Sequence, residues 1–284
     1  MRDFVLTRLA AFFGAVIGTA VLLFLALDIL PGAGAPDRPA WARFLGLFIG
    51  DTGASPNMFG ERLAVTLPLV LLALAIAAAG GIALGLSAGW YHGGILGRAA
   101  KAVAAGLAVL PPFWLGMLLA LLFAGALKLL PASGFVRWGD NPAAALASLI
   151  LPALALGLPY AGQLALRVRR DLSEASDTEI LQLRAEGLTP RQARWRIGLD
   201  RALPELPQVL GRTFGALLLG AALVESVFYL PGLGRQIIGA AVQHDLALLR
   251  GGLFVLVVLA ALGMLLFALL RLLVDPALRP ELRR

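Results

Sequence analysis

The chain has 284 residues, of which 60% are hydrophobic and only 14% are charged, and its mean hydropathy is +0.86. Soluble domains carry roughly 25% charged residues, so these values exclude a water-soluble globular domain and indicate that lipid surrounds much of the chain. The lack of cysteine excludes a disulfide framework and thiolate metal sites. The net charge of +7 fits arginines facing an anionic membrane surface better than a nucleic-acid partner.

Six apolar segments are long enough to cross a hydrocarbon core roughly 30 Å thick. They cover residues 9–30, 63–89, 102–130, 143–166, 208–230 and 251–273. The first is longer than the roughly 7–15 apolar residues of a signal peptide, so we interpret it as a retained span. The ten-residue alternating segments of a membrane barrel are missing from the sequence. The sequence therefore predicts an all-α, polytopic membrane helix bundle with about six transmembrane helices.

We expect the chain to form one membrane domain over residues 1–284, with its core at residues 63–274. Residues 1–62 would form the first transmembrane helix and a short external segment, and residues 167–207 a polar, arginine-rich loop. When the N-terminus is placed inside, 17 of the 24 Lys and Arg residues fall on the inner side. Positive residues favour the cytoplasmic side, so we expect the arginine-rich loop and both termini to be cytoplasmic.

Two features of the spans are candidates for function. Pro111 and Pro112 remove backbone donors within the third span and should kink or break it. Such a break either lines a pathway or serves packing alone, and the sequence leaves both readings open. Glu225 lies near the outer end of the fifth span, where we favour a structural role for its carboxylate, capping residues 231–235, over contact with a cationic solute or a receptor.

The spans carry no carboxylate or histidine clearly at the membrane midplane, where a proton- or sodium-coupled carrier needs one. They also lack the buried base of an intramembrane hydrolase. The energy source for any transport is therefore expected on another subunit. We predict no catalytic residue and no metal site in this chain.

Two short helices are predicted inside the arginine-rich loop. Ser176 and Glu179 fit a capping box that begins a helix running to Glu186, and Gly187 supplies its C-terminal stop. Thr189 and Pro190 fit the start of a second helix, which should end near Leu199. Such a helical pair is too short and too tethered to bind DNA. It lies flat on the membrane or inserts into a groove of a cytoplasmic protein, and physical reasoning alone does not decide between the two.

The residues of this loop resemble the ATPase-coupling motif of the dipeptide, oligopeptide and nickel permeases of binding-protein-dependent ABC importers. That motif is loosely E-A-A-x-x-x-G, nine residues, then I-x-L-P, and Gly187 stands at its fixed glycine. Leu181, Glu186 and Asp200 depart from the usual residues. The matching or neighbouring positions are Glu179, Ile180, Leu183, Arg184, Ala185, Glu186, Gly187, Leu188, Ile197 and Leu199. The blocks 130–135, LPASGF, and 224–235, VESVFYLPGLGR, resemble that family more specifically.

The resemblance implies a permease subunit of the bacterial inner membrane that forms a translocation pathway for peptides, nickel or related small solutes. It implies a second permease subunit, two cytoplasmic ATP-binding subunits and an external solute-binding protein as partners. ATP and Mg would bind the ATPase partners, and this chain would bind no cofactor and be no enzyme itself. Candidates for the pathway or external gate are Pro111, Pro112, Glu225, Pro231, Gly232 and Gly234. The competing interpretation is a membrane scaffold that recruits a soluble partner through the loop.

Overall fold

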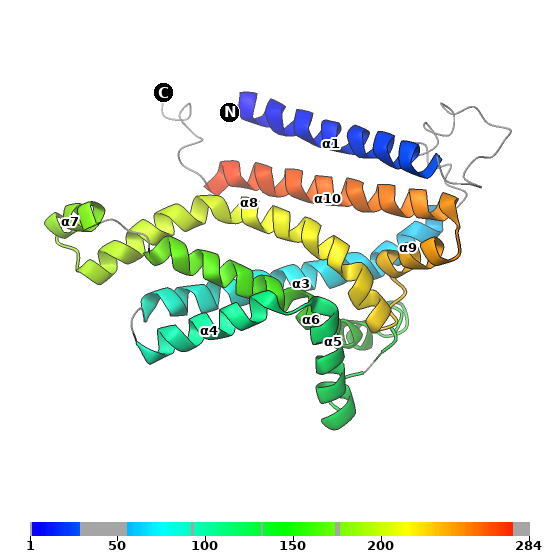
Figure 1. Cartoon of the computed structure of the whole chain (residues 1–284), viewed down its shortest axis with the longest axis horizontal. Helices are drawn as coiled ribbons and strands as arrows, with labels where there is room; N and C mark the ends of the chain where they lie inside the picture. The colour runs from blue at the N-terminus through cyan, green and yellow to red at the C-terminus, as the bar shows by residue number, and fades with distance from the viewer. Residues whose placement is uncertain (1, 29–55, 92–93, 132, 174–176, 275–284) are drawn as a thin grey trace.

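The computed structural model describes residues 2–28, 56–91, 94–131, 133–173 and 177–274, and its regular structure is helical throughout these ranges (Figure 1). This confirms the predicted all-α class. In chain order the helices are α1 Arg2–Asp28, α3 Pro56–Trp90, α4 Ile95–Val109, α5 Pro112–Leu119, the π-helical segment η1 Ala120–Ala126, α6 Pro142–Ser173, α7 Asp177–Ala185, α8 Pro190–Val227, α9 Leu233–Val242 and α10 Leu246–Val274. Of the external segment expected after the first span and up to residue 62, residues 31–55 lie outside the described residues, and residues 56–62 form the first turns of α3.

Five described helices are long and apolar enough to cross a membrane: α1, α3, α6, α8 and α10. A sixth crossing is available if α4 and α5–η1 form one broken span. The prediction of about six spans is therefore confirmed. α1 packs along α10 on one side of the molecule, while α3, α6 and α8 pack together at its centre.

The third span is broken at the predicted prolines. Leu110 and Pro111 are both extended, and Pro112 occupies the first turn of α5, where its missing N–H costs nothing. The two halves of the span are bent by 106°. Figure 1 shows α5 projecting away from the bundle formed by α3, α6 and α8.

A row of glycines lets α3 and α6 approach closely. A Cβ atom added at Gly85 would lie 2.7 Å from the Cβ of Val168 and 2.9 Å from the carbonyl oxygen of Ala165. Gly81 and Gly89 meet α6 side chains at similar distances. Only a residue without a side chain fits such contacts, which are typical of membrane helix pairs.

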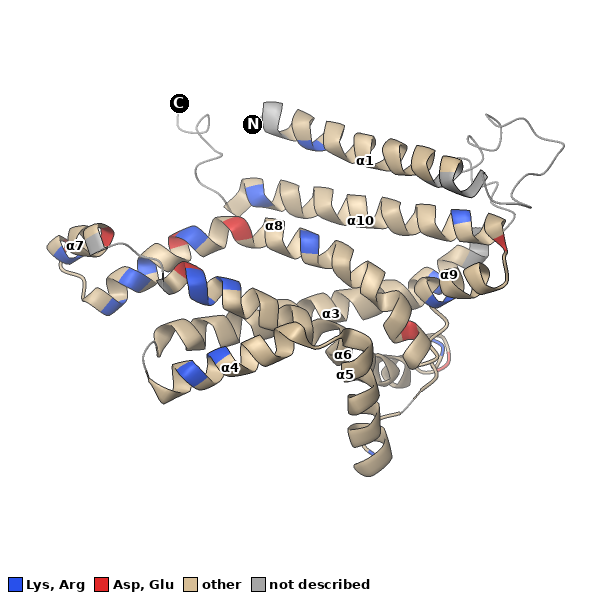
Figure 2. Ribbon diagram, in the orientation of Figure 1, with Lys and Arg blue, Asp and Glu red and all other residues tan. Residues whose placement is uncertain are grey.

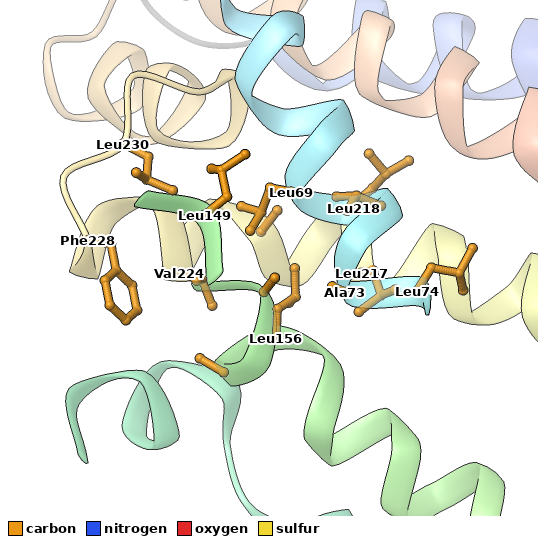
Figure 3. Packing of buried hydrophobic residues seen from close by; sticks show 14 of the residues in the cluster. Leu69, Ala73, Leu74, Leu149, Leu156, Leu217, Leu218, Val224, Phe228 and Leu230 are labelled. Atoms are coloured by element: carbon orange, nitrogen blue, oxygen red, sulfur yellow. The ribbon is translucent and has the colours of Figure 1, made fainter. Parts of the chain in front are cut away.

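The main hydrophobic core lies where α3, α6 and α8 meet. Leu69 of α3, Leu149 of α6 and Leu217 of α8 belong to one cluster of packed side chains, part of which is drawn in Figure 3, and all three are fully buried. Phe228, immediately after α8, closes the core at the C-terminal end of α8 and packs against α5 at Gly116. The core therefore fixes the end of α8 that carries Glu225.

The arginine-rich segment is more helical than the sequence predicted. α6 continues to Ser173, and α8 begins at Pro190 and runs without interruption to Val227. The predicted end of the second helix near Leu199 is therefore wrong, and the described residues between 167 and 207 belong to the end of α6, to α7, to the turn after it and to the first part of α8. Pro204 and Pro207 lie inside α8, where packing of α8 on α6 and α10 offsets the backbone hydrogen bonds that proline removes.

Lysine and arginine gather at the end of the bundle that carries α7 (Figure 2). An ion pair between Arg167 of α6 and Glu205 of α8 joins the two helices there. Arg271, near the end of α10, donates a hydrogen bond of 2.6 Å to Gln208 of α8. The polar ends of α6, α8 and α10 thus form one connected surface, from which α7 projects (Figure 1).

Candidate functional site

The short helix α7 packs its apolar face on the first turns of α8. Ile180 is buried against Ala193 and Ile197 of α8, and Leu183 packs partly against the same cluster. Ile180 and Leu183 thus form an apolar face of α7, and this face is occupied within the chain. The proposed capping residue Ser176 lies outside the described residues, so the predicted capping box stays a prediction.

The turn after α7 has the geometry predicted for Gly187. This glycine has a φ of +92°, a left-handed conformation that other residues rarely adopt. Its N–H donates to the carbonyl of Arg184 at 3.0 Å, and the N–H of Leu188 donates to the carbonyl of Leu183 at 3.1 Å. A Cβ at Gly187 would meet no atom within 4 Å, so the requirement for glycine lies in the backbone alone.

The start of α8 follows two residues later and is capped as predicted. The Thr189 hydroxyl accepts a hydrogen bond from the N–H of Gln192, and the Gln192 side chain accepts one from the N–H of Thr189. Pro190 occupies the first helical position. A left-handed glycine and a complete capping box therefore fix the turn between α7 and α8.

An ion pair further joins α7 to α8. Arg201 donates to both oxygens of Glu179, at 2.6 and 2.8 Å, across 22 residues of sequence. Glu179 thus faces α8, as does the buried Ile180, which packs on Ile197 of α8. The predicted coupling residues Arg184, Ala185 and Glu186 point outward and are exposed. Leu181, which departs from the motif, exposes 60% of its surface. Leu188 and Leu199 are half-buried.

At the opposite end of α8, Glu225 is fully buried and hydrogen-bonded. Thr66 of α3 donates to its Oε1 at 2.6 Å, and the N–H of Arg235 in α9 donates to its Oε2 at 2.9 Å. The Thr66 hydroxyl in turn accepts from the N–H of Leu233 at 2.8 Å. These contacts join α3, α8 and the first turn of α9, and they satisfy donors that α9 leaves open at its N-terminus.

The glycines of the 231–235 segment allow this close approach. A Cβ at Gly232 would lie 2.3 Å from the Glu225 carboxyl carbon, and a Cβ at Gly234 would lie 2.4 Å from the Cα of Ala222. Arg62 donates to the carbonyl of Pro231 at 3.2 Å. Glu225, Pro231, Gly232 and Gly234 therefore form one site, as their grouping in the sequence predicted.

Beside this site lies a pocket of about 420 Å³ whose walls include Arg62, Arg235, Gln236 and Asp245. Pro111 is exposed and Pro112 half-buried. No recorded contact within the described residues joins these two prolines to Glu225. The structure thus places Glu225, Pro231, Gly232 and Gly234 in one cluster and the two prolines at a separate helix break.

The sequence predicted the contact of Glu225 with the 231–235 segment, but it did not predict that Thr66 and Arg62 of α3 join this site. Thr66 is 159 positions from Glu225 in the chain, and Arg62 is 169 positions from Pro231. The one available signal was an isolated threonine within the apolar run of α3, where a hydroxyl needs a partner.

The fold and these two sites define a class of protein: a multi-pass membrane protein with a rigid helical projection at its basic end.

The family described as binding-protein-dependent transport system inner membrane component matches residues 81–280. A putative peptide transport system permease protein of Brucella abortus is 30% identical, over 98% of this chain and 99% of the relative. The dipeptide transport system permease protein DppB of Escherichia coli K12 is also 30% identical, with the same coverage.

Among solved structures, the MetNI methionine ABC transporter in an inward-facing conformation resembles this fold with a TM-score of 0.57. That similarity covers 78% of this chain and 99% of the other chain, at 21% identity. The chain belongs to the family of binding-protein-dependent transport system inner membrane components. It is accordingly a multi-pass permease of the inner membrane, as the resemblance seen in its sequence implied.

Proposed function

We propose that this permease forms, with a second permease subunit, the pathway of an ATP-driven importer, and that α7 transmits the motion of two cytoplasmic ATP-binding subunits. The observation that carries this proposal is the rigid attachment of α7 to α8. A buried apolar cluster, a bidentate ion pair and a capped turn hold α7 in place. A movement imposed on α7 should therefore move α8 with it.

The length of α8 extends this connection through the bundle. A helix of 38 residues measures about 57 Å at 1.5 Å per residue, enough to pass from α7 to Glu225. The first turn of α9 is bonded to Glu225, so tilting of α8 would displace α9 at the outer end. We assign Glu225, Pro231, Gly232 and Gly234 to an external gate of this kind. Glu225 has a structural role in this gate, because it holds the first turn of α9 in place. Pro111 and Pro112 stay candidates for the pathway wall.

The outward face of α7 supplies the contact with the ATPase. Arg184, Ala185 and Glu186 are exposed there, beside Leu181. A short helix that presents mixed charge and one apolar side chain suits insertion into a groove of a protein partner. ATP and Mg would bind the partner subunits and not this chain.

The concentration of Lys and Arg around α7 supports a cytoplasmic position for this end and for both termini (Figure 2). The outer cluster then faces an external solute-binding protein. Relatives named as peptide and dipeptide permeases favour peptides as the solute. Nickel or another small solute is the alternative.

Uptake by a reconstituted complex tests this proposal. Vesicles containing this chain, its ATPase subunits, the second permease and the solute-binding protein should accumulate a labelled dipeptide only when ATP is present. Uptake of nickel but not of dipeptide would identify nickel as the solute, and the proposed ATP-driven mechanism would stand. Stable assembly with the partners but no ATP-dependent uptake of any supplied solute would favour the scaffold interpretation.

A further inference from the structure

A cavity of about 930 Å³ lies at the basic end of the bundle, where α3 ends and where α4 and α8 begin. Ile180, Thr189 and Pro190, which belong to the contacts between α7 and α8, form part of its wall, but its aromatic and arginine side chains take no part in those contacts. Its walls include the aromatic side chains Trp90, Tyr91 and Trp195, two arginines and the aliphatic residues that begin α4. This combination of side chains indicates which kind of ligand the cavity suits.

Aromatic rings hold the first arginine in place. The Arg191 guanidinium lies 4.0 Å from the ring centre of Trp90 and 6.0 Å from that of Tyr91. Its Nη2 donates to the carbonyl oxygen of Trp90 at 3.1 Å. Trp195 packs edge-on against Trp90, with ring centres 4.8 Å apart. Arg191 is therefore positioned in advance, and other guanidinium donors are left for a ligand.

The second arginine supplies an unneutralised charge. Arg194 lies one helical turn after Arg191, is exposed and lines the same cavity. It has no hydrogen bond or ion pair with any residue that the structure describes. Among the residues recorded as lining the cavity there is no Asp or Glu. The positive end of the α8 dipole points to the same place, so the cavity favours an anion.

The position of the cavity indicates the source of that anion. The membrane-crossing part of α3 ends at Trp90, and the broken span begins at Ile95. Tryptophan and tyrosine concentrate at the headgroup level of membranes. At the edge of the cavity, Ile95 and Leu96 expose 78% and 64% of their surface. An anionic headgroup in the cavity would thus have apolar side chains beside it for its acyl chains.

We propose that this cavity binds the phosphate group of an anionic phospholipid, such as phosphatidylglycerol, through Arg191 and Arg194. Arginine binds phosphate oxygens in a bidentate geometry and is common where phosphate recognition matters. The acyl chains lie along Ile95 and Leu96. The inference rests on the proposed cytoplasmic position of this end, where anionic lipids are enriched. A protein partner could also bind the arginines, but the exposed side chains of Ile95 and Leu96 and the aromatic residues beside the arginines favour a lipid.

Lipid retention by the full-length chain, purified with its ATPase subunits, tests the proposal. The complex is exchanged into micelles containing phosphatidylglycerol or phosphatidylcholine, and bound lipid is counted by native mass spectrometry. We expect preferential retention of phosphatidylglycerol and about fivefold weaker retention by R194Q, as expected for the loss of one basic residue at a membrane surface. R194K should retain most of the binding. R196Q, an exposed arginine on the same helix outside the cavity lining, is the matched control and should bind like the wild type.

Three results would overturn the lipid site. The first is equal retention of the two lipids, or unchanged phosphatidylglycerol retention by R194Q. The second is full displacement of phosphatidylglycerol by millimolar inorganic phosphate, which would indicate a free-anion site. The third is loss of the ATPase subunits from R194Q with lipid retention intact, which would assign the cavity to the ATPase interface. Lipid retention by a complex that shows no ATP-dependent uptake would instead contradict the importer proposal alone.

Discussion

Thr66 and Glu225 form a 2.6 Å hydrogen bond between α3 and α8, although 159 residues separate them in the chain. Both side chains are fully buried. The same two residues accept backbone N–H groups from the start of α9, at Leu233 and Arg235. A pair of polar residues inside an apolar bundle thus holds the short helix α9 in a fixed position.

Removing the carboxylate should weaken this end of the bundle. In E225A the hydroxyl of Thr66 and the N–H of Arg235 lose their acceptors while buried, which costs about 1–3 kcal/mol. We expect E225A to lower the unfolding free energy in mixed micelles by that amount and to lose uptake. S226A is the control, because the Ser226 hydroxyl bonds only within its own helix, to the carbonyl of Ala222. Equal stability of E225A and S226A would contradict the structural role.

Replacing Gly187 by valine should disrupt coupling without preventing membrane insertion. The left-handed conformation at φ +92° costs a residue with a Cβ roughly 1–2 kcal/mol, so the turn and the position of α7 should change. We expect G187V to reach the membrane at normal levels but to lose dipeptide uptake. G187N should be milder, because asparagine tolerates this conformation.

The control for G187V is G134V, at a position with a φ of +88° and equally open surroundings. Gly134 bonds to Phe228 at the outer end of the bundle, so its replacement imposes similar strain far from α7. G134V should keep its ATPase subunits during purification, and G187V should lose them. Equal retention in the two variants would show that the turn at Gly187 is not needed for the contact.

Charge reversal at the Glu179–Arg201 pair should be repaired by the double exchange. E179R and R201E each place like charges together, whereas E179R/R201E restores an ion pair between α7 and α8. Both residues are about 40% exposed, so the effect on stability should stay within about 1 kcal/mol. We expect the single variants to reduce ATP-dependent uptake and the double variant to recover most of it. No recovery would indicate that Glu179 or Arg201 contacts the partner directly.

The helix contact between α3 and α6 should not accept a methyl group at Gly85. In G85A the new Cβ would overlap Val168 and the backbone of Ala165, and such overpacking typically costs about 1–3 kcal/mol. A thermal unfolding series in micelles would measure the loss. G106A in α4 is the matched change, because a Cβ there meets nothing within 4 Å. It should be neutral or slightly stabilising.

Local sequence signals predicted the local structure well. Gly187, Thr189 and Pro190 define their turn through their own backbone preferences, and Pro111 and Pro112 break their span for the same reason. The predictions failed where packing between distant segments overrides such preferences. The second helix was expected to end near Leu199, but packing on α6 and α10 keeps α8 continuous through Pro204 and Pro207.

Contacts across long sequence separations could not be predicted. The partner of Glu225 depends on how α3 packs beside α8, and no local pattern marks Thr66 as that partner. The aromatic and basic cavity was missed for a similar reason, since Trp90 and Arg191 are 101 positions apart. A tryptophan and a tyrosine directly after an apolar run were the available sign that this end of α3 lies at a membrane surface.

The central claim is that α7 contacts an ATP-binding subunit on the cytoplasmic side. The chain has no cysteine, so R184C introduces a single reactive thiol on the exposed face of α7, and R137C places one near the outer end of the bundle. Both variants are treated with a short thiol-to-amine crosslinker in inside-out membrane vesicles. The account predicts that R184C crosslinks to the ATPase and that R137C does not. Labelling of R184C only from the outer face, with no crosslink to the ATPase, would contradict it.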